Sequence, residues 1–186
     1  MNFWMIIYAC WIVFVLYWIL SARSVKAAAK RQSWVETLAH KVPVGLGYML
    51  LFVPNLLGSA PVVVSDAAFS KTLGVAICVS GLLGTIWSRR TLAGNWSSNV
   101  EFKQEHEFIN RGPYRFVRHP IYASLLLMSL GTALSANRIG GFAGLLSFFV
   151  GVWIKLKQEE KLLIQHFPDA YPAYKARVKA LVPFVF

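Results

Sequence analysis

Long uncharged stretches alternate with short basic segments along this chain. Runs without Asp, Glu, Lys or Arg cover residues 3–22, 42–65, 72–88, 119–137 and 139–154. A helix that crosses a bilayer needs about 20 mostly apolar residues. The pattern therefore predicts an all-α, polytopic membrane protein with about five transmembrane helices.

Proline and glycine modify these predicted helices. Pro54 and Pro61 fall within the second run, so we expect that helix to kink or end early. Only Arg138 separates the last two runs, which predicts a tight helical hairpin whose turn is relieved by Gly140 and Gly141. Gly144 lies four residues after Gly140, and such a pair permits close helix approach inside a bundle.

Composition supports a membrane protein and charge predicts its orientation. Hydrophobic residues make up 56% of the chain and charged residues 15%, against about 25% charged in soluble domains. Of the 19 Lys and Arg residues, only Lys71 and Arg138 lie outside segments 23–41, 89–118 and 155–186. The positive-inside rule then predicts an outside N-terminus and a cytoplasmic C-terminus. This asymmetry accounts for the net charge of +11 without a nucleic-acid partner.

The N-terminal half shows helical patterning but no evident chemistry before residue 90. Trp4, Trp11 and Trp18 recur every seven residues and form one stripe on a helix. The stripe predicts packing and interfacial anchoring, with a dimer seam as the alternative. Cys10 and Cys78 fall inside predicted spans, where we expect them to act as small hydrophobic residues.

Polar residues gather in two segments on the predicted cytoplasmic side, 89–122 and 155–177. Pro120 predicts a helix start, which places His119 at the membrane boundary. Arg115 and Arg118 add positive charge there, so an anionic group would be held well. The alternative is that these arginines contact lipid phosphates.

Carboxylates are expected close to this cluster, because the two helices form a hairpin. Lys155 and Glu159 are four residues apart and share one helix face, whereas Glu160 lies about 100° around the helix. Both glutamates could pair with their neighbours Lys157 and Lys161. Opposite the His and Arg cluster, however, they suit a zwitterionic ligand. The histidines are scattered, and no spacing typical of a metal site is present.

These polar segments resemble a known family. Residues 112–122 read Gly-Pro-Tyr-Arg-Phe-Val-Arg-His-Pro-Ile-Tyr, and a helical hairpin, Glu159-Glu160 and then Phe167, Tyr171 and Tyr174 follow. Over about residues 90–186, the pattern resembles the isoprenylcysteine carboxyl methyltransferase family and, more loosely, the phospholipid methyltransferases. The resemblance implies an integral membrane enzyme that uses S-adenosylmethionine and releases S-adenosylhomocysteine. It also implies a cytosolic cofactor pocket roofed by the loop before the His-Pro helix and by the C-terminal segment.

The resemblance also assigns roles to residues. Implied cofactor-binding residues are His106, Glu107, Phe108, Ile109, Tyr114, His119, Pro120, Ile121, Tyr122 and Glu159. Lys155 stands where members with isoprenylcysteine activity carry a substrate-facing arginine, and it lacks the bidentate fork that grips a carboxylate. No dedicated catalytic residue is implied; Tyr122 and His119 would position the reacting groups.

The expected function is methyl transfer to a lipophilic acceptor. The first candidate acceptor is the carboxylate of an isoprenylcysteine-like substrate, and a phospholipid amine or a small thiol are alternatives. An NADPH-dependent, sterol-reductase-like enzyme or a non-enzymatic membrane scaffold are alternatives of another class. We expect one domain, with three transmembrane helices in residues 1–88 and the cofactor-binding half in residues 89–186. The expected location is a prokaryotic plasma membrane, or the endoplasmic reticulum of a eukaryote.

Overall fold

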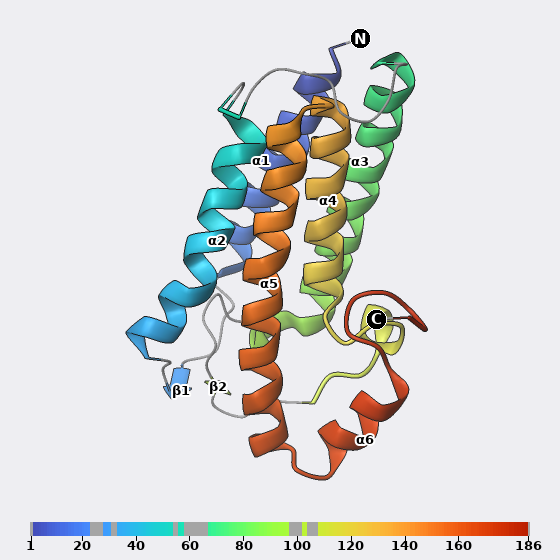
Figure 1. Cartoon of the computed structure of the whole chain (residues 1–186). Helices are drawn as coiled ribbons and strands as arrows, with labels where there is room; N and C mark the ends of the chain where they lie inside the picture. The colour runs from blue at the N-terminus through green and yellow to red at the C-terminus, as the bar shows by residue number, and fades with distance from the viewer. Residues whose placement is uncertain are drawn as a thin grey trace.

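The chain folds into an elongated helical bundle (Figure 1). The computed structural model describes residues 2–22, 28–30, 33–53, 56–57, 67–96, 102–103 and 108–185. In these ranges the elements are α1 (Phe3–Ala22), β1 (Ala28–Lys30), α2 (Trp34–Phe52), α3 (Ala67–Leu92), η1 (Ala93–Asn95), β2 (Phe102–Lys103), η2 (Gly112–Arg115), α4 (Pro120–Ala136), α5 (Ile139–His166) and α6 (Ala170–Arg177).

Three helices in the described part of the chain are long and apolar enough to cross a membrane. They span residues 3–22, 68–92 and 139–166, and α4 is a shorter apolar helix. On α1, large apolar side chains such as Ile12, Leu16 and Ile19 are exposed. Such a surface suits lipid contact, which supports the all-α membrane fold that the sequence predicts.

The second helix differs from the prediction. The charge-free run predicted a span over residues 42–65, but α2 covers Trp34–Phe52. A capping box starts the helix, because the Ser33 side chain accepts from the Glu36 N–H and the Glu36 carboxylate accepts from the Ser33 N–H. The helix ends at Phe52, as expected for a segment that runs into Pro54. The predicted span overlaps α2 over residues 42–52, and it missed the capped, polar first turns of the helix.

The hairpin between α4 and α5 is confirmed, although its turn is not made by glycine. Asn137 adopts a left-handed conformation with φ 45°, and α5 begins two residues later. Gly141 instead lies inside α5, where a Cβ would stand 3.2 Å from the Cα of Ala133. The expectation that glycines relieve the turn was wrong, because the short polar side chain of Asn tolerates this conformation.

Glycine contacts hold two pairs of helices close together. A Cβ on Gly47 of α2 would lie 2.8 Å from the backbone nitrogen of Phe148 of α5. A Cβ on Gly74 of α3 would lie 2.5 Å from the carbonyl oxygen of Gly131 of α4. The pairs α2–α5 and α3–α4 therefore meet backbone to backbone, as small residues allow in membrane bundles.

The tryptophan stripe of α1 faces the bundle. Trp11 is buried, and its indole N–H donates to Thr132 Oγ1 at 3.0 Å. Trp18 meets Trp96 edge to face at 5.7 Å between ring centroids. The packing role is therefore confirmed for Trp11. Cys10 and Cys78 are buried and unpaired by disulfide, as expected of small core residues.

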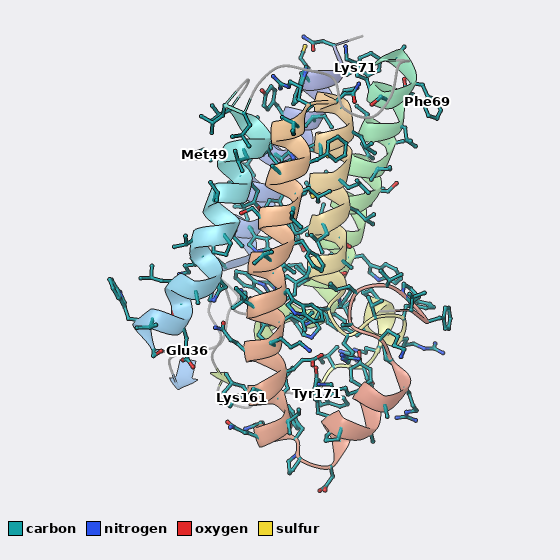
Figure 2. All side chains as sticks on the ribbon, viewed as in Figure 1. Glu36, Met49, Phe69, Lys71, Lys161 and Tyr171 are labelled. Atoms are coloured by element: carbon teal, nitrogen blue, oxygen red, sulfur yellow. The ribbon has the colours of Figure 1, made fainter. Side chains whose placement is uncertain are left out.

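The two ends of the bundle differ in polarity. Lys71 lies at one end, whereas Glu36, Lys161 and Tyr171 lie toward the other (Figure 2). The end with Lys161 also carries α6 and a small antiparallel sheet in which β1 pairs with β2 (Figure 1). The sequence analysis did not predict this sheet. The described residues among those that the resemblance assigns to the site lie toward this same end.

Candidate active site

The C-terminal segment docks beside the start of α4. The backbone N–H of Arg118 donates to the carbonyl of Lys179 at 2.8 Å, and that of His119 donates to Ala180 at 3.0 Å. Pro120 then begins α4, where a missing N–H costs nothing. These bonds fix His119 at the meeting point of α4 and the C-terminal segment.

Glu160 joins three parts of the chain through a buried ion network. Arg118 donates from Nε and Nη2 to Oε1 at 2.8 and 2.6 Å, and Lys175 Nζ lies 2.7 Å from Oε2. His119 Nε2 lies 3.4 Å from Oε1, and the Glu160 side chain is only 3% exposed. The network connects the start of α4 to α5 and α6. The sequence led us to expect that Arg118 helps to hold an anionic ligand. In the structure its guanidinium instead pairs with Glu160 inside the protein.

Glu160 therefore does not follow the alternative of pairing with its neighbours along α5. Lys157 instead places its Nζ over the ring of Trp153, 4.5 Å from the centroid. Lys161 is exposed. The partners of Glu160 are 15 to 42 positions away in sequence, so helix spacing could not reveal them.

Glu159 has different surroundings from its neighbour. The Tyr122 hydroxyl donates to its Oε1 at 2.5 Å, and Lys155 Nζ lies 3.8 Å from the same oxygen. His119 Nδ1 lies 3.8 Å from Oε2. The Glu159 side chain is 23% exposed. This carboxylate is partly accessible and lies between a cation, a phenol and an imidazole.

Two stacked rings lie beside that carboxylate. The rings of His119 and Tyr122 stack at 5.7 Å between centroids, and Lys155 Nζ lies 5.5 Å from the Tyr122 centroid. Four residues that the resemblance implies for cofactor and substrate thus meet at one place: Lys155, His119, Tyr122 and Glu159.

A second aromatic cluster lies beside η2. The hydroxyl of Tyr174 donates to the carbonyl of Tyr114 at 2.5 Å, and Phe108 packs 5.3 Å from the Tyr174 ring. Burial raises the pKa of Tyr174 to about 12. Burial, reinforced by the charge of Glu159, also raises the pKa of Tyr114 well above its usual value. Both phenols are therefore neutral at pH 7 and cannot serve as anionic bases.

Other residues of the predicted site lie elsewhere or outside the description. Ile121 is buried in the apolar core of the bundle with Cys78 and Met128, so its side chain belongs to packing rather than to the polar cluster. Pro120 is buried at the start of α4, and Ile109 is half-buried before η2. His106 and Glu107 lie outside the described residues.

Sequence reasoning missed one buried polar residue near Lys155. His40 of α2 is 2% exposed and lies 3.0 Å from Gln158 Oε1 of α5. It precedes the region where the sequence shows chemistry, and nothing in its local pattern marked it. Only the packing of α2 on α5 could have found it.

Comparison with known families adds to this geometry. The family model described as Phospholipid methyltransferase matches residues 69–170, which is more than half of the chain. The chain belongs to the phospholipid methyltransferase family. The match covers α3, α4 and α5 and reaches the start of α6, so it includes the four residues gathered around Glu159.

Relatives of this phospholipid methyltransferase family member include proteins named as isoprenylcysteine O-methyltransferases and one named as a methanethiol S-methyltransferase. Protein-S-isoprenylcysteine O-methyltransferase B of Arabidopsis thaliana is 35% identical over 91 residues, 46% of this chain and 44% of that protein. Protein-S-isoprenylcysteine O-methyltransferase of Homo sapiens is 31% identical over 102 residues, which are 51% of this chain and 34% of that protein. Methanethiol S-methyltransferase 1 of Bradyrhizobium diazoefficiens is 37% identical over 71 residues, which are 38% of this chain and 24% of that protein. The chain spans less than half the length of these relatives.

Proposed function

We propose that this protein is a membrane-embedded, S-adenosylmethionine-dependent methyltransferase that acts on a lipophilic acceptor. The carboxylate of an isoprenylcysteine-like substrate is the acceptor we favour. The observation that carries the proposal is the cluster of Glu159, His119, Tyr122 and Lys155 inside the family match. Relatives named as isoprenylcysteine O-methyltransferases support the acceptor.

The residues present fit S-adenosylmethionine. When bound, this cofactor supplies a methyl group on a sulfonium, together with an ammonium, a carboxylate and ribose hydroxyls to be recognised. The partly exposed carboxylate of Glu159 suits the ammonium or the ribose hydroxyls. His119 suits the polar end of the cofactor, and the rings of Tyr114 and Tyr122 suit the sulfonium through cation–π contact.

The remaining implied residues would complete this cofactor-binding half, which we place in residues 89–186. His106, Glu107, Phe108 and Ile109 would enclose the cofactor as a loop. Pro120 and Ile121 would contribute through the backbone at the start of α4, because the side chain of Ile121 is committed to the core. Residues 1–88 would supply the N-terminal helices of the same single domain.

The chain's own residues would act by holding and orienting the acceptor relative to the cofactor. Lys155 would bind the acceptor carboxylate, which is already deprotonated at neutral pH and needs no base. By holding the acceptor carboxylate in line with the methyl group, the protein would supply several kcal/mol of the rate enhancement. Exclusion of water by the surrounding apolar helices would strengthen the electrostatic attraction between the reacting groups. The neutral phenols of Tyr114 and Tyr174 fit a mechanism without a protein base.

Thiol methylation is the second candidate. The relative from Bradyrhizobium diazoefficiens carries the name of a thiol methyltransferase, and Lys155 would stabilise a thiolate as well as a carboxylate. A phospholipid amine would need a base to remove its proton, and the same screen of acceptors tests it. The relatives named above are methyltransferases rather than reductases or scaffolds.

The proposed orientation follows the charge distribution. The candidate site and Lys161 lie at one end of the bundle, and Lys71 lies at the other (Figure 2). The segments rich in Lys and Arg are those predicted to face the cytoplasm. We place this end in the cytoplasm, where S-adenosylmethionine would enter, and the N-terminus outside. A lipophilic acceptor would enter from the membrane.

Binding of S-adenosylhomocysteine to detergent-purified protein tests the cofactor assignment. Wild type should bind it saturably. Glu159→Ala should weaken binding at least about tenfold, because a charged hydrogen-bond partner is lost. Asp169→Ala also removes a carboxylate, but at an exposed position on the same end of the bundle, and this variant should bind S-adenosylhomocysteine like wild type. Absence of binding to folded wild type, or unchanged binding by Glu159→Ala, would contradict the proposal.

A screen with radiolabelled methyl donor then identifies the acceptor. Prenylcysteines, ethanolamine lipids and small thiols would be compared with the same protein preparation. We expect label in the prenylcysteine methyl ester, recognised by its release with mild base. Label in a thioether or in a lipid amine instead would keep the methyltransferase and replace its acceptor.

A further inference from the structure

A buried histidine lies on the α2 side of the candidate site. His40 is 2% exposed, and it precedes the apolar run that begins at Val42. The helices meet closely here, because a Cβ on Gly151 of α5 would lie 2.8 Å from the His40 carbonyl oxygen. His40 is therefore held against the same helix that carries Lys155 and Glu159.

The hydrogen bonds of His40 determine where its proton lies. Nδ1 is 3.1 Å from the carbonyl oxygen of Glu36 and 3.0 Å from Gln158 Oε1. Both neighbours are acceptors, so Nδ1 carries the hydrogen. The side-chain amide of Gln158 cannot flip without losing a hydrogen bond, because its nitrogen donates to the same Glu36 carbonyl at 3.0 Å. The other ring nitrogen, Nε2, therefore presents a lone pair.

That lone pair has no partner among the residues that the structure describes. Nε2 of His40 is buried and makes no hydrogen bond within this part of the chain. Buried polar atoms are almost always paired, so a buried atom without a partner needs an explanation, and a functional contact is one. Desolvation, followed by the positive charge of Lys155, lowers the pKa of His40, so the ring is neutral at pH 7. A neutral acceptor thus lies within electrostatic reach of a cation.

A cation beside a lone pair is complementary to an anion beside an N–H. The C-terminal residue of a peptide presents an anion beside an N–H, because one carbon joins its carboxylate to its own amide nitrogen. A simple thiol or a fatty acid presents only one of the two groups. Lys155 is also in contact with Glu159, so the same cation links this recognition to the cofactor residues.

We propose that His40 Nε2 accepts a hydrogen bond from the amide N–H next to the acceptor carboxylate, while Lys155 holds the carboxylate itself. This inference rests on the proposed function and adds to it one contact between the protein and the acceptor. His40 is then a specificity-determining residue contributed by α2, outside the segment 69–170 that the family model matches.

Two acceptors that differ only in the amide test the contact. N-acetyl-S-farnesylcysteine has the N–H, and S-farnesyl-3-thiopropionate has the same chain and carboxylate without it. Wild type should prefer the first by roughly tenfold in kcat/KM, as expected for one hydrogen bond to a buried group. In His40→Phe, which keeps the ring volume, the preference should fall to about one. The exposed His166→Phe should retain the wild-type preference.

Further variants keep the test independent of folding. His40→Gln can place a carbonyl oxygen near the position of Nε2 and should restore part of the preference. Gln158→Met removes one of the two acceptors that fix the tautomer, so an intermediate preference is expected with S-adenosylhomocysteine binding intact. Where His40→Phe does not fold, His40→Met removes the acceptor nitrogen, and a wild-type preference in folded His40→Met would overturn the proposal.

The remaining outcomes separate this inference from the proposed function. Equal losses on both acceptors in His40→Phe, with cofactor binding retained, would show a structural role and overturn the inference. So would a wild type that does not distinguish the two acceptors or that methylates neither. Failure of folded wild type to bind S-adenosylhomocysteine would instead overturn the proposed function itself.

Discussion

At the scale of single residues, two adjacent glutamates on α5 illustrate how surroundings assign roles. Glu160 is 3% exposed and bonded to Arg118 and Lys175, whereas Glu159 is 23% exposed and contacts Tyr122 and Lys155. A buried carboxylate with two cationic partners ties elements together, and removal of one partner leaves uncompensated charge. A partly exposed carboxylate retains capacity for a ligand.

The two glutamates should therefore respond oppositely to the same substitution. Glu160→Gln strands Arg118 and Lys175 and should destabilise the protein by roughly 3 kcal/mol. Its thermal unfolding midpoint in detergent should fall by several degrees. Glu159→Gln should leave this midpoint near wild type and weaken S-adenosylhomocysteine binding. A reversal of these two phenotypes would contradict the roles we assign.

At the scale of elements, the site depends on how closely α2 and α5 approach. Gly47 and Gly144 bring the two backbones together, and Gly151 continues the contact toward His40. In a membrane bundle such contacts supply packing that hydrophobicity alone cannot. The same approach positions His40 against Gln158, so helix packing and site geometry are coupled.

Two glycines on α2 offer a matched test of this packing. Gly47→Ala places a Cβ 2.8 Å from the backbone of Phe148, which cannot move aside cheaply, and should cost about 1–3 kcal/mol. Gly45→Ala meets nothing within 4 Å and should leave the unfolding midpoint unchanged or slightly higher. Similar midpoints for the two variants would show that α2 and α5 are not held by this contact.

At the scale of the whole molecule, polarity is sorted along the bundle axis. Lys71 lies at one end, and Lys161 lies at the end that carries α6 and the candidate site (Figures 1 and 2). The excess of Lys and Arg in the segments at this end sets the expected orientation in a membrane. This arrangement would let the cofactor arrive from water and the acceptor from lipid.

Labelling of single cysteines measures this orientation. In a Cys10→Ala, Cys78→Ala background, Lys71→Cys should react with a membrane-impermeant maleimide added to intact cells. Lys161→Cys should react only in inverted vesicles, because the positive-inside rule places it in the cytoplasm. The opposite pattern would invert the proposed topology, and S-adenosylhomocysteine binding provides the check that both variants are folded.

The sequence by itself determined the fold class and pointed to much of the candidate site. Charge-free runs of bilayer length identify apolar helices, and the hairpin at Arg138 follows from their short separation. The motif around His119 and the pair at Glu159 identify the polar cluster, because those residue types recur at fixed spacing on helix starts and helix faces. Local spacing also predicted the shared face of Lys155 and Glu159, which the structure brings within 3.8 Å.

The tertiary structure alone decided the contacts between distant segments. The partners of Glu160 and the orphan nitrogen of His40 depend on helix packing and on docking of the C-terminal segment. None of these has a periodic signature, because residues 15 to 118 positions apart meet only when the helices assemble. Periodicity specifies which face of a helix is apolar or polar, whereas packing specifies what that face meets.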